Sequence, residues 1–227
     1  MSDDVGGVLP VIPETTLRIT EVFHSLQGEA RTSGLPTVFV RLTGCPLRCV
    51  YCDTAYAFSG GENRALIDIV EQVKGFNCST VCVTGGEPLA QPNCIPLLKA
   101  LVAQGLDVSL ETSGAMDIEA VPVAVSRVMD LKTPDSQESH RNLWSNLAHL
   151  TVHDQIKFVV MSRADFDWAI EMIHEHNLLD RVGDVWISPS HHDVSPSALA
   201  DWVLESGLPV RLQLQLHKIL WNDEPGR

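Results

Sequence analysis

The sequence predicts an α/β fold, a partial or modified TIM-type (β/α) barrel of parallel strands joined by crossover helices. Short β-rich runs alternate with amphipathic patterns of helical spacing, which is typical of a parallel sheet with crossover helices. A complete eightfold barrel needs about 250 residues, whereas this chain has 227 and includes polar connections such as 132–141. No internal repeat interrupts the alternation. We therefore expect one domain over residues 1–227, with an extended lead-in at 1–16 and a tail at 222–227.

The expected strands and helices follow one another along the chain. β-rich runs occur near residues 18–23, 37–43, 80–84, 106–110, 127–131, 156–161, 184–188 and 209–216. Helical patterns occur near 63–76, 93–104, 164–177 and 195–206, with weaker ones near 117–124 and 142–149. In the third of these helices, Phe166, Ile170 and Ile173 share one face and acidic or histidine side chains occupy the other, which is amphipathic spacing.

The composition favours a small-molecule partner. The formal net charge is −13 and the 16 basic residues are scattered, whereas a nucleic-acid surface needs clustered Lys and Arg. No apolar stretch approaches a membrane span, and Met1-Ser2-Asp3-Asp4 lacks the positive region of a signal peptide. Six cysteines without a secretory signal indicate a reducing compartment. We expect a cytoplasmic protein that binds neither nucleic acid nor membrane.

Three cysteines, Cys45, Cys49 and Cys52, stand in one short loop after the apolar run 37–43. A four-iron, four-sulfur cluster has four corners, so three protein ligands leave one iron open to a substrate or cofactor. A structural zinc site needs four ligands, and no second Cys-x-x-Cys or His pair stands at the usual distance. An electron carrier normally closes all four corners. The remaining cysteines fit buried thiols: Cys78, Cys82 and Cys94.

Polar or glycine-rich segments follow the other expected strands. In parallel barrels the reacting groups collect at the carboxyl ends of the strands, so we expect these segments to meet the cysteine loop around one mouth. They are Thr84-Gly85-Gly86-Glu87-Pro88, Glu111-Thr112-Ser113-Gly114, Asp130-Leu131-Lys132-Thr133-Pro134, Ser188-Pro189-Ser190-His191 and His217-Lys218.

Several of these segments also have a purely structural interpretation. Gly85-Gly86 fits a turn that needs positive φ, Glu111 and Ser113 fit a helix cap, and His191 and His192 fit a solvent-facing loop. We favour ligand contact for the glycine pair, because backbone exposed at a strand end lets a ligand approach closely.

Arg41 lies inside the expected strand 37–43, four positions before the first cysteine of the loop. A guanidinium is rarely placed there unless it is paired, and its planar fork suits a carboxylate. The structural alternative is an internal salt bridge with Glu29. We favour binding of a substrate carboxylate. The preceding segment Ser25-Leu26-Gln27-Gly28-Glu29 offers backbone donors and acceptors of the kind that bind a heterocycle edge.

Two of these motifs together resemble the radical S-adenosylmethionine superfamily. There, a Cys-x-x-x-Cys-x-x-Cys loop, here Cys45 to Cys52, binds a four-iron, four-sulfur cluster, and Gly-Gly-Glu-Pro, here 85–88, contacts the amino group of S-adenosylmethionine. Further segments make residues 18–221 similar to the 7-carboxy-7-deazaguanine synthase family. They are Ser25–Glu29, Phe39–Cys45, Cys52–Thr54, Glu111–Gly114 and Leu216–Lys218.

This resemblance implies a carbon–nitrogen lyase of queuosine biosynthesis, a tRNA-modification pathway. The implied reaction is a radical ring contraction of 6-carboxy-5,6,7,8-tetrahydropterin to 7-carboxy-7-deazaguanine, with loss of ammonia. The implied cofactors are the cluster, S-adenosylmethionine and Mg²⁺. The cofactor carries the hard chemical step and the protein supplies orientation, dryness and electrostatics.

The resemblance also implies roles for individual residues. Arg41 would bind the substrate carboxylate, and Thr54 would ligate Mg²⁺. The other implied substrate contacts are Leu26, Gln27, Gly28, Glu29, Thr84 and His217. The implied S-adenosylmethionine contacts are Gly86, Glu87, Ser113, Asp130, Leu131, Lys132, Ser188, Pro189, Ser190 and His191. Some relatives have Ser-Pro-Lys where this chain has 130–132.

Two alternatives stay open from the sequence. A glycyl-radical-enzyme activase shares the cluster motif but leaves Arg41 and Gln27-Gly28 without a purpose. An iron–sulfur electron carrier does not need an open iron. For the lyase we expect a flavodoxin- or ferredoxin-type reductant and a homodimer.

Overall fold

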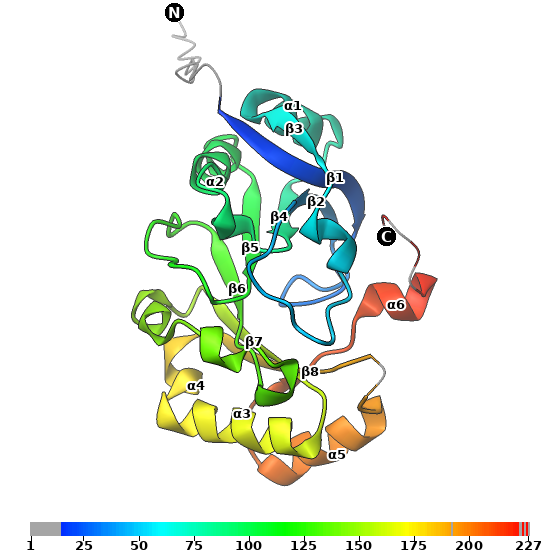
Figure 1. Cartoon of the computed structure of the whole chain (residues 1–227), viewed down its shortest axis with the longest axis vertical. Helices are drawn as coiled ribbons and strands as arrows, with labels where there is room; N and C mark the ends of the chain where they lie inside the picture. Colours follow the sequence, from blue (N-terminus) through cyan, green and yellow to red (C-terminus); the bar gives the residue numbers. More distant parts are fainter. Residues whose placement is uncertain (1–14, 192, 223, 225, 227) are drawn as a thin grey trace, which may run out of the picture.

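The computed structural model describes residues 15–191, 193–222, 224 and 226. Most of the expected lead-in, His192 and part of the expected tail lie outside the described residues. Within them the chain forms one nine-stranded sheet in the order β3-β1-β2-β4-β5-β6-β7-β8-β9 (Figure 1). The strands are β1 (Thr16–Leu26), β2 (Pro36–Leu42), β3 (Glu62–Ala65), β4 (Thr80–Gly85), β5 (Asp107–Thr112), β6 (Ser126–Asp130), β7 (Gln155–Val160), β8 (Asp184–Pro189) and β9 (Arg211–Leu212).

Most of the sheet is parallel and open. β2 pairs in parallel with β4, and each further neighbour as far as β9 is also parallel. β1 runs antiparallel to both β2 and β3. β3 and β9 end the sheet on opposite sides, so it does not close into a complete barrel. The predicted partial barrel is confirmed.

α-Helices return the chain between most of the parallel strands, whereas the β5–β6 connection has no helix and the β6–β7 connection has only 3-10 helices. The helices are α1 (Leu66–Gly75), α2 (Cys94–Ala103), α3 (Arg163–Glu175), α4 (Leu178–Arg181), α5 (Pro196–Ser206) and α6 (Leu216–Trp221). Figure 1 shows α2 beside β4 and β5, and α3 and α5 toward the other end of the sheet. Leu97 of α2, Phe166 of α3 and Leu199 of α5 are fully buried in one core with Val83 and Leu110 of the sheet. Burial of each such side chain contributes roughly 1.5–3 kcal/mol.

Several elements differ from the sequence-based expectation. The pattern near 63–76 begins as strand β3, and α1 starts only at Leu66. The weak pattern at 117–124 forms no helix, because Ile118 and Val121 enter the core from a loop. The weak pattern at 142–149 forms a 3-10 helix, η5 (Trp144–His149), rather than an α-helix.

The expected strand at 209–216 is much shorter than its alternating pattern suggests. Only Arg211–Leu212 pairs with β8, as β9. Beyond it the chain turns toward the end of β1, where the Leu216 N–H donates to the Gly28 carbonyl at 3.0 Å. The glutamine side chains in this stretch bind Glu29 instead of facing solvent. His217 therefore lies on helix α6 and not at a strand end.

No helix among the residues described is long and apolar enough to cross a membrane.

Candidate active site

A cavity of about 820 Å³ opens at the carboxyl ends of the parallel strands. The cysteine loop, the glycine segment after β4 and the ends of β5 to β8 all contribute to its wall. The predicted site residues that line it are Leu26, Gln27, Gly28, Glu29, Arg41, Cys45, Cys49, Cys52, Thr54, Thr84, Gly86, Ser113, Asp130, Lys132, Ser188, Pro189, Ser190, His191 and His217. The two others, Glu87 and Leu131, are buried in the protein interior behind this wall.

The three cysteines of the loop are half-buried free thiols. Their loop runs from the end of β2 to the 3-10 helix η1 (Ala55–Phe58). It is held at its start, because the Gly44 N–H donates to the Ala57 carbonyl at 2.8 Å and the Gly44 carbonyl accepts from the Glu87 N–H at 2.8 Å. The thiols and the glycine segment are thereby fixed against each other.

The close packing of the segment at the end of β4 explains why glycine occupies positions 85 and 86, which the sequence alone did not reveal. A Cβ on Gly85 would lie 2.6 Å from the Leu42 carbonyl oxygen, and a Cβ on Gly86 would lie 2.3 Å from that of Gly44. Any side chain would therefore push the segment off the cysteine loop. Gly86 also lines the cavity.

Glu87 uses its carboxylate to join the ends of β4 and β5. It accepts from the Leu89 N–H at 3.0 Å, from the Ser113 N–H at 2.7 Å, and from the hydroxyls of Thr112 and Ser113. The side chain is completely buried, so these donors satisfy it. The carboxylate therefore supports the cavity wall from behind.

Arg41 lines the cavity from β2, next to Glu21 of β1. Its Nε donates to Glu21 Oε1 at 2.7 Å, and the Tyr56 hydroxyl donates to the same oxygen at 2.8 Å. The guanidinium lies 5.9 Å from the ring centroid of Phe23 and 5.8 Å from that of Tyr56. The internal salt bridge that the sequence left open as an alternative is therefore present, but its partner is Glu21, because Glu29 pairs with Lys157 instead.

A chain of alternating charges crosses the strand ends beside Arg41. Lys157 Nζ lies 2.8 Å from Glu29 Oε2 and 3.6 Å from Asp130 Oδ2, and Lys132 Nζ lies 3.1 Å from that same oxygen. Burial of the Glu29 carboxyl raises its pKa, but the charge and hydrogen bond of Lys157 outweigh burial, so the pKa lies below its ordinary value. Glu29 is therefore ionised at neutral pH.

Asp130 has one oxygen left over in this chain of charges. Among the described residues, its Oδ1 is buried and has no hydrogen-bond partner. An unsatisfied buried carboxylate oxygen costs about 1–3 kcal/mol or more. Because Asp130 lines the cavity, a ligand donor there would satisfy it.

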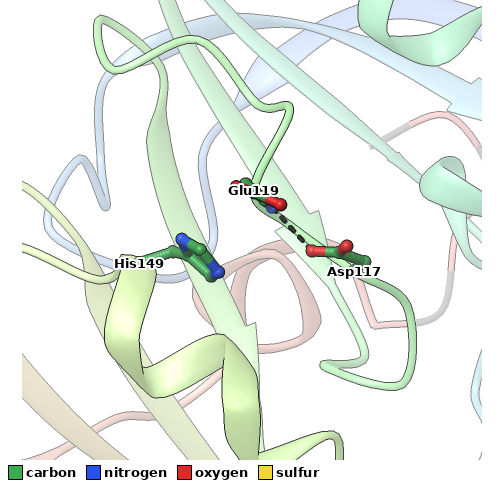
Figure 2. Close-up of side chains that lie close together, drawn as sticks. All are labelled: Asp117, Glu119 and His149. Carbon is green, nitrogen blue, oxygen red and sulfur yellow. Dashed lines mark hydrogen bonds between the residues drawn. The ribbon is translucent and has the colours of Figure 1, made fainter.

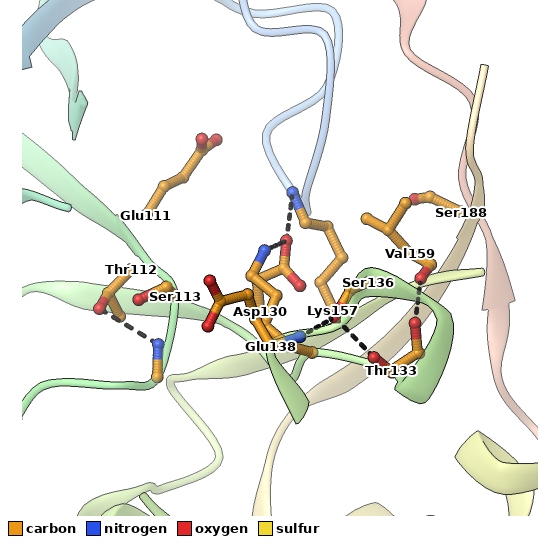
Figure 3. Close-up of polar contacts among 12 residues, drawn as sticks. Glu111, Thr112, Ser113, Asp130, Thr133, Ser136, Glu138, Lys157, Val159 and Ser188 are labelled. Carbon is orange, nitrogen blue, oxygen red and sulfur yellow. Dashed lines mark hydrogen bonds and ion pairs between the residues drawn. The ribbon is translucent and has the colours of Figure 1, made fainter. Parts of the chain in front are cut away.

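Glu111 lines the cavity. From the sequence alone it fitted either a ligand contact or a helix cap. It lies next to the last residue of β5 (Figure 3). Thr84 Oγ1 donates to Glu111 Oε2 at 3.2 Å. Burial raises the pKa of the Glu111 carboxyl and the charge of Glu29 raises it further, while Lys157 and Arg41 offset only part of the rise. A carboxyl with a raised pKa can hold a proton and donate it in a hydrogen bond.

Helix α6 and the end of the cysteine loop form the neighbouring part of the cavity wall, and Gln215 joins it to Glu29, because its Nε2 donates to both Glu29 and Asp53. Lys218 Nζ lies 3.2 Å from Asp53 Oδ2, and Gln215 Nε2 donates to the same oxygen at 3.1 Å. Burial raises the pKa of Asp53, but Lys218 and these hydrogen bonds hold it well below its usual range. The Thr54 hydroxyl donates to Asp53 Oδ1 at 2.8 Å, so Asp53 ties Thr54 to α6.

Gly28 and His217, 189 positions apart in the chain, meet at this side of the cavity. A Cβ on Gly28 would lie 2.1 Å from His217 Nδ1, so only glycine leaves room for the imidazole. Burial lowers the pKa of His217, and the charges of Glu29 and Asp53 offset this only in part. The imidazole is therefore mostly neutral at pH 7 and offers one donor and one acceptor.

A second group of possible metal ligands lies outside the cavity. Asp117, Glu119 and His149 place ligand atoms within 4.8 Å of one another, on the loop after β5 and at the end of η5 (Figure 2). The two carboxylates are exposed, and the Glu119 N–H donates to Asp117. None of the three lines the cavity that holds the cysteines.

Comparisons with known proteins agree on the family. Residues 39–187 match the Radical SAM superfamily. The chain is 42% identical to the 7-carboxy-7-deazaguanine synthase of Koribacter versatilis, over 92% of this chain and 98% of that protein. It is 39% identical to the 7-carboxy-7-deazaguanine synthase of Chlorobaculum tepidum, over 93% of this chain and 97% of that protein.

A solved structure agrees on the fold. The crystal structure of QueE from Escherichia coli matches with a TM-score of 0.74 at 22% identity, covering 90% of this chain and 96% of that chain. This match shows the fold, and the family model and the two sequence relatives show the family. The chain belongs to the 7-carboxy-7-deazaguanine synthase family of the radical S-adenosylmethionine superfamily.

Proposed function

We propose that this chain is a 7-carboxy-7-deazaguanine synthase, a lyase that converts 6-carboxy-5,6,7,8-tetrahydropterin into 7-carboxy-7-deazaguanine with loss of ammonia. The observation that carries the proposal is one cavity whose wall contains both three free cysteines and Arg41. A cluster and a carboxylate-bearing substrate would meet in that space. The family assignment sets aside the glycyl-radical activase and the electron carrier.

The side chains present suit the cofactors of this family. Three thiols on one loop provide three ligands for a four-iron, four-sulfur cluster and leave the fourth iron for S-adenosylmethionine. The buried Oδ1 of Asp130 offers an acceptor to the donors of S-adenosylmethionine in the same cavity. When bound, the cluster and S-adenosylmethionine supply the radical chemistry that the protein side chains cannot perform.

We infer that the S-adenosylmethionine side of the cavity runs from Gly86 past Asp130 to β8. Backbone at Gly86, at the end of β5 and around 188–191 supplies donors and acceptors, and Lys132 supplies a cation. Glu87 and Leu131 contribute by holding this wall in place, because both are buried behind it. The residues that line the cavity, and not Glu87 or Leu131, would contact the cofactor.

The heterocycle of the substrate would occupy the side formed by Glu29, Glu111 and His217. An ionised Glu29 accepts hydrogen bonds, Glu111, whose carboxyl pKa is raised by burial, donates one when it holds a proton, and a neutral imidazole does either. Leu26, Gln27, Gly28 and Thr84 complete this side. A pterin edge carries both N–H donors and a carbonyl acceptor, so mixed partners of this kind bind it in one orientation.

The substrate carboxylate would bind Arg41, whose fork matches two carboxylate oxygens. Thr54 would ligate Mg²⁺ through its hydroxyl oxygen, with waters and the substrate as further ligands. The Thr54 hydroxyl donates a hydrogen bond to the Asp53 carboxylate, which leaves the lone pairs of the Thr54 oxygen available to a cation. We also propose a single domain over 1–227, a cytoplasmic homodimer, and a flavodoxin- or ferredoxin-type reductant.

Anaerobic turnover tests the function. The protein, reconstituted with iron and sulfide, is given the carboxytetrahydropterin, S-adenosylmethionine, Mg²⁺ and a chemical reductant, and the product is identified by mass. We expect 7-carboxy-7-deazaguanine in the complete reaction and none without S-adenosylmethionine. Cys49→Ala, which removes one cluster ligand, is the matched inactive control. A fully loaded cluster without product would refute the proposal.

A further inference from the structure

Glu21 occupies a defined place beside the proposed carboxylate-binding Arg41. The antiparallel register of β1 and β2 sets the two residues opposite each other, and both side chains line the cavity. The ion pair is well shielded, since the side chains of Arg41 and Glu21 are 16% and 24% exposed. The strand pairing therefore fixes the geometry of this ion pair, which is not a mobile surface contact.

The contact uses only one edge of the guanidinium. Glu21 Oε1 accepts from Arg41 Nε, which is the donor nearest the side-chain stem. The rings of Phe23 and Tyr56 lie close to the guanidinium, at 5.9 and 5.8 Å from its carbon. Rotation of the side chain would break both the hydrogen bond and these ring contacts. The terminal Nη1 and Nη2 then form the edge that a second carboxylate can approach with two parallel hydrogen bonds.

Tyr56 fixes Glu21 in turn. Its hydroxyl donates to the same oxygen that accepts from Arg41, and it comes from η1, the 3-10 helix that follows the cysteine loop. The Tyr56 residue is 57% exposed, and its hydroxyl is protonated at neutral pH as in an ordinary tyrosine, so it serves as the donor. One carboxylate oxygen thus connects β1, β2 and the 3-10 helix that follows the cysteine loop.

We propose that Glu21 is a positioning residue for substrate recognition: it holds Arg41 by Nε, with Tyr56 as its support, so that the Nη1–Nη2 edge faces the substrate carboxylate. This inference rests on the proposed function of Arg41. The alternative is that Glu21 competes with the substrate carboxylate for Arg41. The two roles predict opposite effects of removing the Glu21 side chain.

Substrate binding to the reconstituted, S-adenosylmethionine-loaded protein separates the two roles. The variants are Glu21→Ala, which removes the acceptor, Glu21→Gln, which keeps an acceptor oxygen, and Tyr56→Phe, which removes only the supporting hydroxyl. Glu62→Gln, an exposed acid on β3, is the matched control. Each protein is titrated calorimetrically with carboxytetrahydropterin and with tetrahydropterin that lacks the carboxylate.

We expect Glu21→Ala to bind the carboxylated substrate roughly 10- to 100-fold more weakly, the effect of losing one or two hydrogen bonds to a charged group. Glu21→Gln stays within about threefold of the unmodified protein, and Tyr56→Phe loses about threefold to tenfold. The compound without the carboxylate binds all variants equally. In turnover, the KM for substrate rises while kcat and the KM for S-adenosylmethionine stay within about threefold.

Three results would overturn the inference while leaving the proposed function intact. They are unchanged binding in Glu21→Ala, tighter binding in both Glu21 variants, and equal weakening for both ligands. If Glu21→Ala fails to fold or to load a cluster, Tyr56→Phe and Glu21→Gln still decide the question, because a Tyr56→Phe variant with unchanged affinity contradicts the support role. If the unmodified protein neither binds nor converts the carboxylated pterin, the proposed function itself fails and the inference with it.

Discussion

Replacing Glu87 by glutamine tests whether this motif residue supports the cavity wall or contacts the cofactor. The carboxylate is fully buried and its two oxygens accept from two backbone N–H groups and two hydroxyls. Glutamine has the same shape but only one acceptor oxygen. If that oxygen faces the Ser113 N–H, the new NH₂ group faces the Leu89 N–H, and two donors confront each other.

The magnitude follows from these contacts. One buried hydrogen bond to a charged acceptor is worth about 1.5–3 kcal/mol, and a buried donor left unsatisfied costs about 1–3 kcal/mol more. We therefore expect Glu87→Gln to lower the free energy of unfolding by about 3–5 kcal/mol. For a chain of this size each kcal/mol lowers Tm by about 2–4 °C, so the fall is about 6–20 °C.

The assay is anaerobic thermal and urea unfolding of the cluster-free protein, followed by S-adenosylmethionine binding to the cluster-loaded protein. Glu62→Gln, on the exposed face of β3, is the control and should change the free energy of unfolding by less than about 0.5 kcal/mol. An unchanged Tm in Glu87→Gln, together with tenfold weaker cofactor binding, would refute the supporting role and favour direct contact.

Three further predictions concern the substrate side of the cavity. Gly28→Ala places a Cβ 2.1 Å from His217 Nδ1, so we expect the imidazole to move and the KM for the pterin to rise roughly tenfold, as steady-state kinetics would reveal; an unchanged KM would contradict a role for His217 in binding. The pKa of His217 is lower in the folded protein than in the unfolded chain, so the unfolded chain binds a proton on this imidazole more readily. The contribution of the neutral imidazole to the free energy of unfolding is therefore complete above about pH 6.5 and is lost as pH falls through the folded pKa. Urea unfolding at several pH values should show this loss in the unmodified protein and a smaller one in His217→Gln, and identical profiles would contradict it. Asp53→Asn removes the partner charge of Lys218 and should weaken Mg²⁺-dependent activation while the cluster absorbance is kept; loss of the cluster instead would show that Asp53 mainly holds the cysteine loop.

Local motifs carried much of the site prediction. The spacing of Cys45, Cys49 and Cys52 and the position of Arg41 near the end of a strand are readable from the sequence, because each depends on a few neighbouring residues. Nearly all of the predicted residues line one cavity, since the carboxyl ends of parallel strands meet at one edge of the sheet.

The partners of these residues were harder to predict because they depend on register and topology. Glu21 faces Arg41 only because β1 is antiparallel to β2, and the strand alternation did not reveal that direction. Lys157 reaches Glu29 across 128 positions of sequence. Glu87 of the Gly-Gly-Glu-Pro motif was predicted to contact S-adenosylmethionine. Its side chain instead points into the protein and binds the end of β5.

The short β9 shows how a segment whose polar side chains bind a carboxylate can have the sequence pattern of a strand. Residues 209–216 alternate apolar and polar side chains, which is the pattern of a half-buried strand. Here the alternation arises because Gln213 and Gln215 point to Glu29 while the chain leaves the sheet for α6. Only the three-dimensional position of Glu29 separates the two interpretations.

The central claim is that the cysteine loop and Arg41 act on one substrate in one cavity. Its most direct test is product formation by the anaerobically reconstituted protein, measured for the unmodified chain and for Arg41→Met at equal cluster content. We predict 7-carboxy-7-deazaguanine from the unmodified chain, and a KM for the carboxylated pterin at least roughly 100-fold higher in Arg41→Met. Absence of product from the unmodified chain, or an unchanged KM in Arg41→Met, would contradict the claim.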